Sequence, residues 1–319
     1  MAELPERVRI REVGPRDGFQ NEPETIATFD KVRLIDQLAR TGLRRLEATS
    51  FVRPDVIPQL ADAAAVLEAL DVPDDVALSV LVPNERGLER ALEHRDRFDE
   101  VSVFLSASES HNRRNVNRSV AASLDGLRRV VARAREAGLR CEGVIATAFG
   151  CPYEGRVPAD RVAALARELR DAGCAEIAFG DTTGMANPKQ VGDLFPYWRD
   201  ALGDDVELTA HFHNTRGQGL ANVLAALHAG VDSFESSFGE LGGCGAAGAL
   251  PSGATGNIAT EDVVSMLEEM GVATGIDLPA LIVATGMVRD VLGRPLGSHV
   301  ATAGPVAWGP AGPDERARS

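Results

Sequence analysis

Val206-Glu-Leu-Thr-Ala-His-Phe-His-Asn214 is an apolar run that ends in two histidines. Its composition predicts a β-strand over 206–213. The amphipathic stretch Gln218–Ala229 follows and stops at Gly230, a residue at which helices commonly end. A second β-rich run, 231–236, comes next. Strand, helix and strand in this order indicate a βαβ unit with parallel strands.

The same unit recurs along the chain. Further strands are predicted at about 7–13, 44–49, 76–82, 99–106, 140–148 and 175–180, and the helical stretches between them include 30–41, 119–137 and 158–172. Eight units fit an α/β fold of the (β/α)8 TIM-barrel type. A doubly wound sheet is the alternative, but Gly14-Pro-Arg-Asp-Gly18 is not the Gly-rich phosphate turn expected after its first strand. Two extra C-terminal helices are expected at about 260–270 and 277–293.

Length and composition limit the protein class. The 319 residues suit one large domain, which we place at 1–295, followed by a flexible tail at 296–319. The net charge of −14 argues against general binding to nucleic acid. No apolar run reaches 18 residues and the first residues carry no secretion signal, so neither a membrane span nor export is expected. The four cysteines form no CxxC pair, and we expect them to be reduced in the cytoplasm.

Polar residues gather where the predicted strands end, which is the functional rim of a TIM barrel. His211 and His213 lie two residues apart on one strand, so their side chains should project to the same side. This spacing suits a divalent metal if carboxylates from other strands complete the ligand set. The other polar residues at predicted strand ends are Arg16, Asp17, Glu47, Asp181, Cys244 and Asn257.

Each of these residues also has a purely structural interpretation. Glu47 lies in a mostly apolar strand, where a carboxylate is costly unless it has a partner, so a buried arginine or a metal-site partner is expected. The other structural interpretations are a surface ion pair for Arg16 and Asp17, helix caps for Asp181 and Asn257, and a small buried residue for Cys244. Their common position at one rim favours a functional site.

These residues make the chain resemble the 3-hydroxy-3-methylglutaryl-CoA lyase family of metal-dependent barrels, from about residue 8 to 293. The matching segments are Val13-Gly-Pro-Arg-Asp-Gly-Phe-Gln-Asn21, Leu46-Glu-Ala-Thr-Ser-Phe-Val52, Phe149-Gly-Cys-Pro-Tyr-Glu-Gly155, Gly180-Asp-Thr-Thr-Gly184, His211-Phe-His213, Gly217-Gln-Gly-Leu-Ala-Asn222, Leu241-Gly-Gly-Cys-Gly245 and Gly253-Ala-Thr-Gly-Asn-Ile-Ala-Thr-Glu-Asp262. The His-x-His segment alone is shared by the wider superfamily.

The resemblance implies a carbon–carbon lyase. It would cleave 3-hydroxy-3-methylglutaryl-CoA, or a close 3-hydroxy-3-alkylglutaryl-CoA, to acetyl-CoA and a 3-keto acid such as acetoacetate. By the same resemblance the enzyme takes part in leucine degradation and ketone-body formation and forms a homodimer. The implied ligands of Mg²⁺ or Mn²⁺ are Asp17, His211, His213 and Asn257.

The resemblance also implies catalytic roles. Arg16 matches the catalytic arginine, and Cys244 matches the cysteine of the mobile active-site loop. Glu47 and Asp181 match active-site acids, and His211 matches a histidine with an acid or base role. How the acid and base roles divide between Cys244 and His211 stays open.

Other segments bear on the substrate. Arg113 and Arg114 follow the fourth strand and are candidates for binding the CoA phosphates, although they could also be plain solvent-exposed arginines. His111 lies beside them. The loop from Cys244 to Asn257 is a few residues longer than is usual in the family. Asn214 stands where the family commonly has Asp, which would remove a charge beside the metal. Because of both departures, the sequence does not decide which 3-hydroxy-3-alkylglutaryl group the enzyme prefers.

Two other functions compete with the lyase. One is a synthase or aldolase on the same metal barrel, but synthases usually carry a regulatory region that the residues after the last predicted helix cannot hold. The short Arg-Asp-Gly-Phe-Gln form at 16–20 also favours the lyase. The second competitor is a barrel that binds an acyl-CoA or a metal without turnover. It would be expected to lack a site residue, and none is missing.

Overall fold

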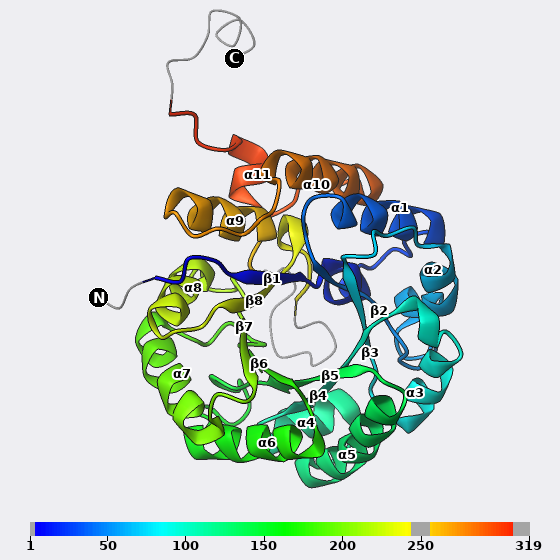
Figure 1. Ribbon diagram of the computed structural model, residues 1–319, viewed down its shortest axis with the longest axis vertical. Helices are drawn as coiled ribbons and strands as arrows, with labels where there is room; N and C mark the ends of the chain where they lie inside the picture. Colours follow the sequence, from blue (N-terminus) through cyan, green and yellow to red (C-terminus); the bar gives the residue numbers. More distant parts are fainter. Residues whose placement is uncertain (1–3, 244–255, 309–319) are drawn as a thin grey trace, which may run out of the picture.

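The computed structural model describes residues 4–243 and 256–308. In these residues eight parallel strands form a closed barrel in sequential order, with the eighth paired to the first (Figure 1). The TIM barrel is therefore confirmed and the doubly wound sheet is wrong. The strands are β1 (Arg9–Glu12), β2 (Arg45–Ser50), β3 (Ala77–Leu81), β4 (Glu100–Ser106), β5 (Arg140–Ala146), β6 (Glu176–Gly180), β7 (Glu207–His211) and β8 (Ser233–Ser236).

Helices surround the barrel, and the glycines predicted to end them do so. Gly42, Gly138, Gly173 and Gly230 all have positive φ, a conformation that glycine adopts at little cost. The helices are α1 (Thr28–Ala39), α2 (Ala63–Ala69), α3 (Glu85–Leu92), α4 (Glu109–Val116), α5 (Val120–Glu136), α6 (Ala159–Ala172), α7 (Pro188–Leu202), α8 (Gly219–His228), α9 (Thr260–Glu269), α10 (Leu278–Leu292) and α11 (His299–Ala303).

The amino end of the barrel interior is filled by charged side chains. Arg11 of β1 is buried, and its guanidinium contacts four carboxylates, those of Glu100, Glu142, Glu176 and Glu235. Buried charges are tolerated only when they are paired in this way. The network leaves the carboxyl end of the barrel as the open end.

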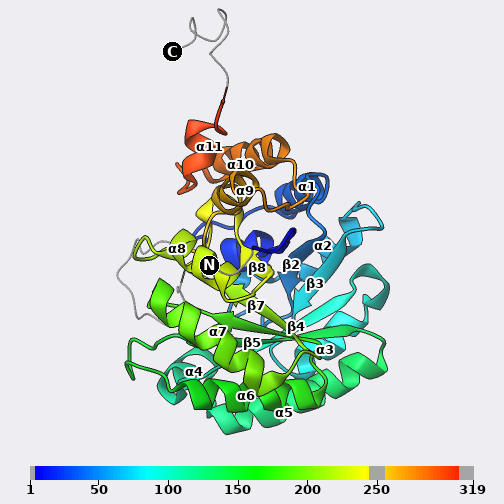
Figure 2. The ribbon, with the colours of Figure 1, turned by 60° about the vertical axis from the view of Figure 1, so that its left-hand side comes forward.

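The three C-terminal helices pack against one another, and α10 joins them to the barrel helices by packing against α1 (Figures 1 and 2). α9 and α10 confirm the predicted extra helices. Within the segment 296–319, which is expected to be a flexible tail, the structure has the short helix α11 at His299–Ala303. Asp262 of α9 anchors it, accepting hydrogen bonds from Ser298 Oγ (3.0 Å) and from Val300 N (2.8 Å). The division of the chain at residue 295 stays a prediction.

No helix within residues 4–243 and 256–308 combines the length and the apolar character needed to cross a membrane.

Candidate active site

Arg16 and Asp17 lie in a single π-helical turn, η1 (Gly14–Gly18), directly after β1. The Arg16 guanidinium joins two carboxylates: Nε donates to Glu47 Oε2 (2.5 Å) and Nη1 donates to Asp17 Oδ1 (2.6 Å). The side chains of Arg16 and Asp17 are each 12% exposed and that of Glu47 is 2% exposed. A surface ion pair is therefore wrong, and Glu47 has the buried arginine partner that its strand requires.

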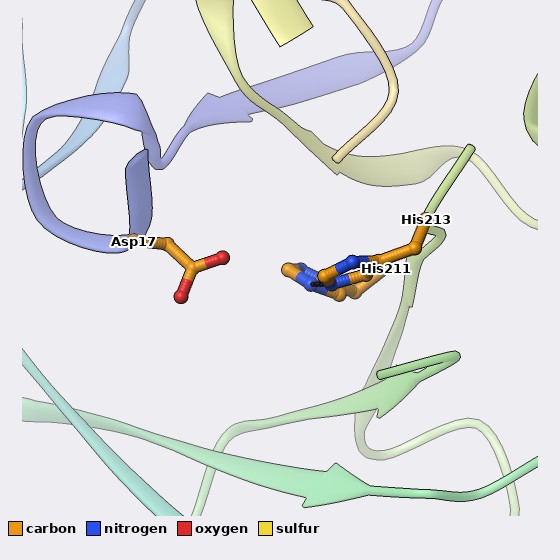
Figure 3. A group of neighbouring side chains, drawn as sticks. All are labelled: Asp17, His211 and His213. Carbon is orange, nitrogen blue, oxygen red and sulfur yellow. Dashed lines mark hydrogen bonds between the residues drawn. The ribbon is translucent and has the colours of Figure 1, made fainter. Parts of the chain in front are cut away.

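The two histidines face Asp17 from the end of β7 (Figure 3). Their Nε2 atoms lie 3.1 Å apart, and a ligand atom of Asp17 lies within 4.8 Å of one on each histidine. Burial, and then the neighbouring His211, lower the pKa of His213 to about 3, so its imidazole is neutral. Burial alone would raise the pKa of Asp17, but Arg16 and the histidines lower it, so the carboxylate is ionised.

Asn257 lies next to His213 and Asp17, and it is held there by one backbone contact and one side-chain contact. The residue pairs with His213 in an isolated antiparallel bridge, and its Nδ2 donates to Asp17 Oδ2 (2.8 Å). Asn257 Oδ1 is buried and has no partner among the described residues. The helix-cap interpretation is wrong, because the residue preceding α9 is Ala259. Gly242 makes the approach possible: a Cβ there would lie 2.6 Å from Asn257 Nδ2.

Asp17, His211, His213 and Asn257 fit a divalent metal; we call them the metal group. Two ring nitrogens that lie 3.1 Å apart cannot both carry protons, whereas the lone pairs of both can bind one ion. The free Oδ1 of Asn257 adds a neutral oxygen ligand and Asp17 adds an anionic one. Oxygen and imidazole donors of this kind suit Mg²⁺ or Mn²⁺.

Asp181 follows β6 at the same rim but has its own partners. Its Oδ1 accepts hydrogen bonds from Met185 N (2.7 Å) and Ala186 N (2.9 Å), while Oδ2 is buried without a partner in the described residues. α7 begins after Asn187, whose side chain caps it, so the helix-cap interpretation of Asp181 is wrong. Burial raises the pKa of Asp181 to about 7, which gives it access to both protonation states near neutral pH.

The sequence analysis missed Glu235 of β8. Its Oε2 lies 2.8 Å from His211 Nδ1, and its Oε1 accepts from Arg11 Nη1 (3.1 Å). A carboxylate that holds the second nitrogen of a metal-binding histidine fixes the ring and its tautomer. The signal was present: Glu235 lies in a short buried strand, as Glu47 does. Its partner was not predictable, because the pairing of β7 with β8 places it opposite His211.

A cavity at the carboxyl end of the barrel collects most of these side chains. Arg16, Asp17, His211, His213 and Glu235 line it. His111 of α4 also lines it; this ring is buried, with Nδ1 at 2.6 Å from Ser106 Oγ and Nε2 unpartnered in the described residues.

Arg113 and Arg114 do not line the cavity, although they lie on the same helix as His111. Both are exposed. Arg113 forms an ion pair with Glu109 (2.7 Å), and Arg114 lies over the Tyr153 ring, 4.4 Å from its centroid. Their candidacy as CoA ligands stays a prediction. Cys244 lies outside the described residues.

Asn214 directly follows His213, and its side-chain amide makes two hydrogen bonds of its own. Its Nδ2 donates to Glu240 Oε1 (2.7 Å), and its Oδ1 accepts from Gly219 N (3.2 Å) at the start of α8. An aspartate could not donate to Glu240, so the amide suits this contact. The asparagine at position 214, where the family commonly has aspartate, therefore links the start of α8 to Glu240 in the segment before Cys244.

Comparison with known proteins identifies the family to which the chain belongs. The family model described as HMGL-like matches residues 7–288. The chain belongs to the HMGL-like family. Hydroxymethylglutaryl-CoA lyase YngG of Bacillus subtilis is 46% identical over 295 residues, which cover 92% of this chain and 96% of that protein. The family resemblance found in the sequence is thus confirmed.

Two further members of the HMGL-like family bear on the substrate. The 3-hydroxy-3-isohexenylglutaryl-CoA/hydroxymethylglutaryl-CoA lyase of Pseudomonas aeruginosa is 42% identical, covering 94% of this chain and 98% of that protein. A solved structure of an Acinetobacter baumannii HMG-CoA lyase, in complex with coenzyme A and 3-methylmalate, is 39% identical with a TM-score of 0.90; it covers 98% of this chain and 100% of that one.

Proposed function

We propose that the protein is a divalent-metal-dependent lyase that cleaves 3-hydroxy-3-methylglutaryl-CoA (HMG-CoA) to acetyl-CoA and acetoacetate. The observation that carries this is the juxtaposition of Arg16 with the metal group in one cavity. The reaction breaks the C2–C3 bond, so it needs a group that holds the C3 hydroxyl oxygen and a separate cation at the thioester oxygen. The relatives that match nearly the full chain are named as HMG-CoA lyases, which supports the assignment.

The chain's own residues divide these tasks. A bound Mg²⁺ or Mn²⁺ would acidify the C3 hydroxyl and stabilise the developing alkoxide. Arg16, already oriented by Glu47 and Asp17, donates to the thioester oxygen as the enolate forms. His211 is held by Glu235 through Nδ1 and lies in the cavity. The family resemblance gives it an acid or base role, which it can fill only through an Nε2 that is not bound to the metal at that moment.

The enolate carbon must then receive a proton to give acetyl-CoA. By the family resemblance, Cys244 and His211 are the candidates for this step. Asp181 at the same rim has its pKa raised by burial to about 7 and is the third group of suitable acidity. Placing Cys244 in this step stays a prediction.

The direct test is release of acetyl-CoA and acetoacetate from HMG-CoA by the purified protein. We expect release with Mg²⁺ or Mn²⁺ present, none after exhaustive chelation, and recovery when either ion is added back. Release that is equally fast in the chelated protein would contradict the metal requirement. Binding of HMG-CoA without any product would favour the non-catalytic barrel, and condensation with a 2-oxoacid would favour the synthase.

Glu235→Gln is expected to weaken metal binding by about 10–100-fold, the usual effect of losing an outer partner of a ligand histidine. The glutamine keeps the size of the side chain but removes the charge shared between Arg11 and His211. The measurement is a calorimetric Mn²⁺ titration. Glu142→Gln is the matched control, because Glu142 also contacts Arg11 but has no contact with His211. Equal affinity in the two variants would show that Glu235 acts only in the charge network.

Several finer proposals accompany this function. Mg²⁺ or Mn²⁺ as the native ion rests on the donor set of the metal group. Arg113 and Arg114 are proposed to bind the CoA phosphates, because they are exposed on the helix that also lines the cavity. A homodimer, a cytoplasmic location and a role in leucine degradation and ketone-body formation are proposed from the family resemblance.

A further inference from the structure

The cavity has an apolar floor made of Phe104 and Val144. Phe104 is the one partly exposed residue of β4, and Val144 is partly exposed between two buried neighbours on β5. The two residues are direct partners across the β4–β5 ladder, and both line the cavity. Their side chains therefore form one continuous apolar surface in a cavity that is also lined by charged residues, among them Arg16 and Asp17, and by the apolar Val52, Ile57 and Leu81.

The floor separates the cavity from the charged network below it. Two residues earlier on each strand, and hence on the same face, are Ser102 and Glu142, joined by a hydrogen bond of 2.6 Å from Oγ to Oε2. Glu142 in turn contacts Arg11. An apolar layer between two charged layers is exposed to water unless an apolar group covers it. Each Å² of apolar surface left exposed costs roughly 25 cal/mol of free energy. The natural cover is the apolar part of a ligand.

The floor lies across the barrel from the metal group. Asp17 follows β1, the histidines lie at the end of β7, and Asn257 follows β8. In the closed ring of eight strands, β4 and β5 are opposite β8 and β1, as Figure 1 shows. A substrate held at the metal group by its C3 hydroxyl oxygen can therefore direct one of the other groups on C3 toward the floor.

We propose that Phe104 and Val144 bind the alkyl group on C3 of the substrate and that Phe104 restricts it to methyl. This rests on the proposed function. C3 carries four groups: the hydroxyl, which belongs at the metal group, one arm that leads to the thioester at Arg16, one arm that ends in a carboxylate, and the alkyl group. Of the four, the alkyl group alone is wholly apolar. The Phe104 ring lines the cavity at the floor and occupies space that a longer chain would need.

The test compares HMG-CoA with a synthetic analogue that carries a butyl group at C3. The quantity is the ratio of kcat/KM for the butyl substrate to kcat/KM for HMG-CoA. We expect wild type to prefer HMG-CoA and Phe104→Ala to shift the ratio toward butyl by about 10–200-fold, the range that one methylene is worth in an apolar pocket. Phe104→Leu makes a smaller opening with less risk to folding and should shift the ratio in the same direction.

Phe179→Leu is the matched control, because Phe179 is a buried phenylalanine of β6 that packs against Trp198 and does not line the cavity. It should lower the melting temperature without changing the ratio. An unchanged ratio in a Phe104 variant that still cleaves HMG-CoA would overturn the inference and leave the proposed function standing. So would a wild type that cleaves both substrates equally well. Failure of wild type to release acetyl-CoA from HMG-CoA would overturn the proposed function itself.

Discussion

Asp17→Ala is expected to lose metal binding and turnover while the barrel stays folded. Asp17 supplies the one anionic oxygen in the metal group, opposite two imidazoles and a neutral amide. Its loss should weaken Mn²⁺ binding by more than the roughly 100-fold upper range for an outer partner. Folding should survive because Arg16 keeps its bond to Glu47 and because the site lies at the functional rim. A Mn²⁺ titration and a thermal melt measure the two effects separately.

Asp181→Asn is the control for this prediction. Asp181 is also buried at the same rim, but its Oδ1 accepts hydrogen bonds from the amides of Met185 and Ala186, and an asparagine oxygen can accept the same bonds. This variant should bind Mn²⁺ as wild type does, whatever its activity. Normal Mn²⁺ affinity in Asp17→Ala would remove Asp17 from the metal group. A collapsed melting temperature in that variant would make its role structural.

The barrel could be predicted because its determinants are local. Each strand is a short β-rich run, and each of the helices 30–41, 119–137, 158–172 and 218–229 ends at a glycine whose positive φ the structure confirms. The observed strands fall within about two residues of the predicted ends. The segment 109–116, by contrast, is not among the predicted helices but forms α4, which begins after Ser108, whose side chain accepts a hydrogen bond from His111 N. A cap before a polar, charged segment gives no apolar periodicity to detect.

The site could be predicted in part for the same reason. His211 ends β7 and His213 lies two residues further on, so their spacing alone brings them to one side of the chain. Glu235 joins His211 only through the pairing of β7 with β8, and pairing register is a property of the closed barrel. The contact of Asn214 with Glu240 could not be predicted either, because Glu240 lies 26 residues away and belongs to a different turn. What the sequence could not supply was contact between elements that no local pattern links.

Arg16→Lys is expected to lower kcat by about 10²–10³-fold although the positive charge is kept. The Arg16 guanidinium uses Nε for Glu47 and Nη1 for Asp17, and within residues 4–243 and 256–308 no hydrogen bond engages Nη2. Nη2 is therefore the nitrogen left for the enolate oxygen. A lysine offers one ammonium in place of this planar fork and cannot hold both carboxylates and the substrate at once. Loss of one oxyanion donor typically costs this much in rate.

The pattern of the kinetic loss identifies the role. An interaction made in the transition state lowers kcat and kcat/KM together, whereas a contact that only binds substrate raises KM and leaves kcat intact. Arg45→Lys is the matched control, since Arg45 also bridges two buried carboxylates, Glu100 and Glu176, but at the amino end of the barrel. It should reduce the melting temperature and leave kcat unchanged. A normal kcat in Arg16→Lys would mean that Arg16 serves to hold Glu47 and Asp17 in place, and another donor would have to stabilise the enolate.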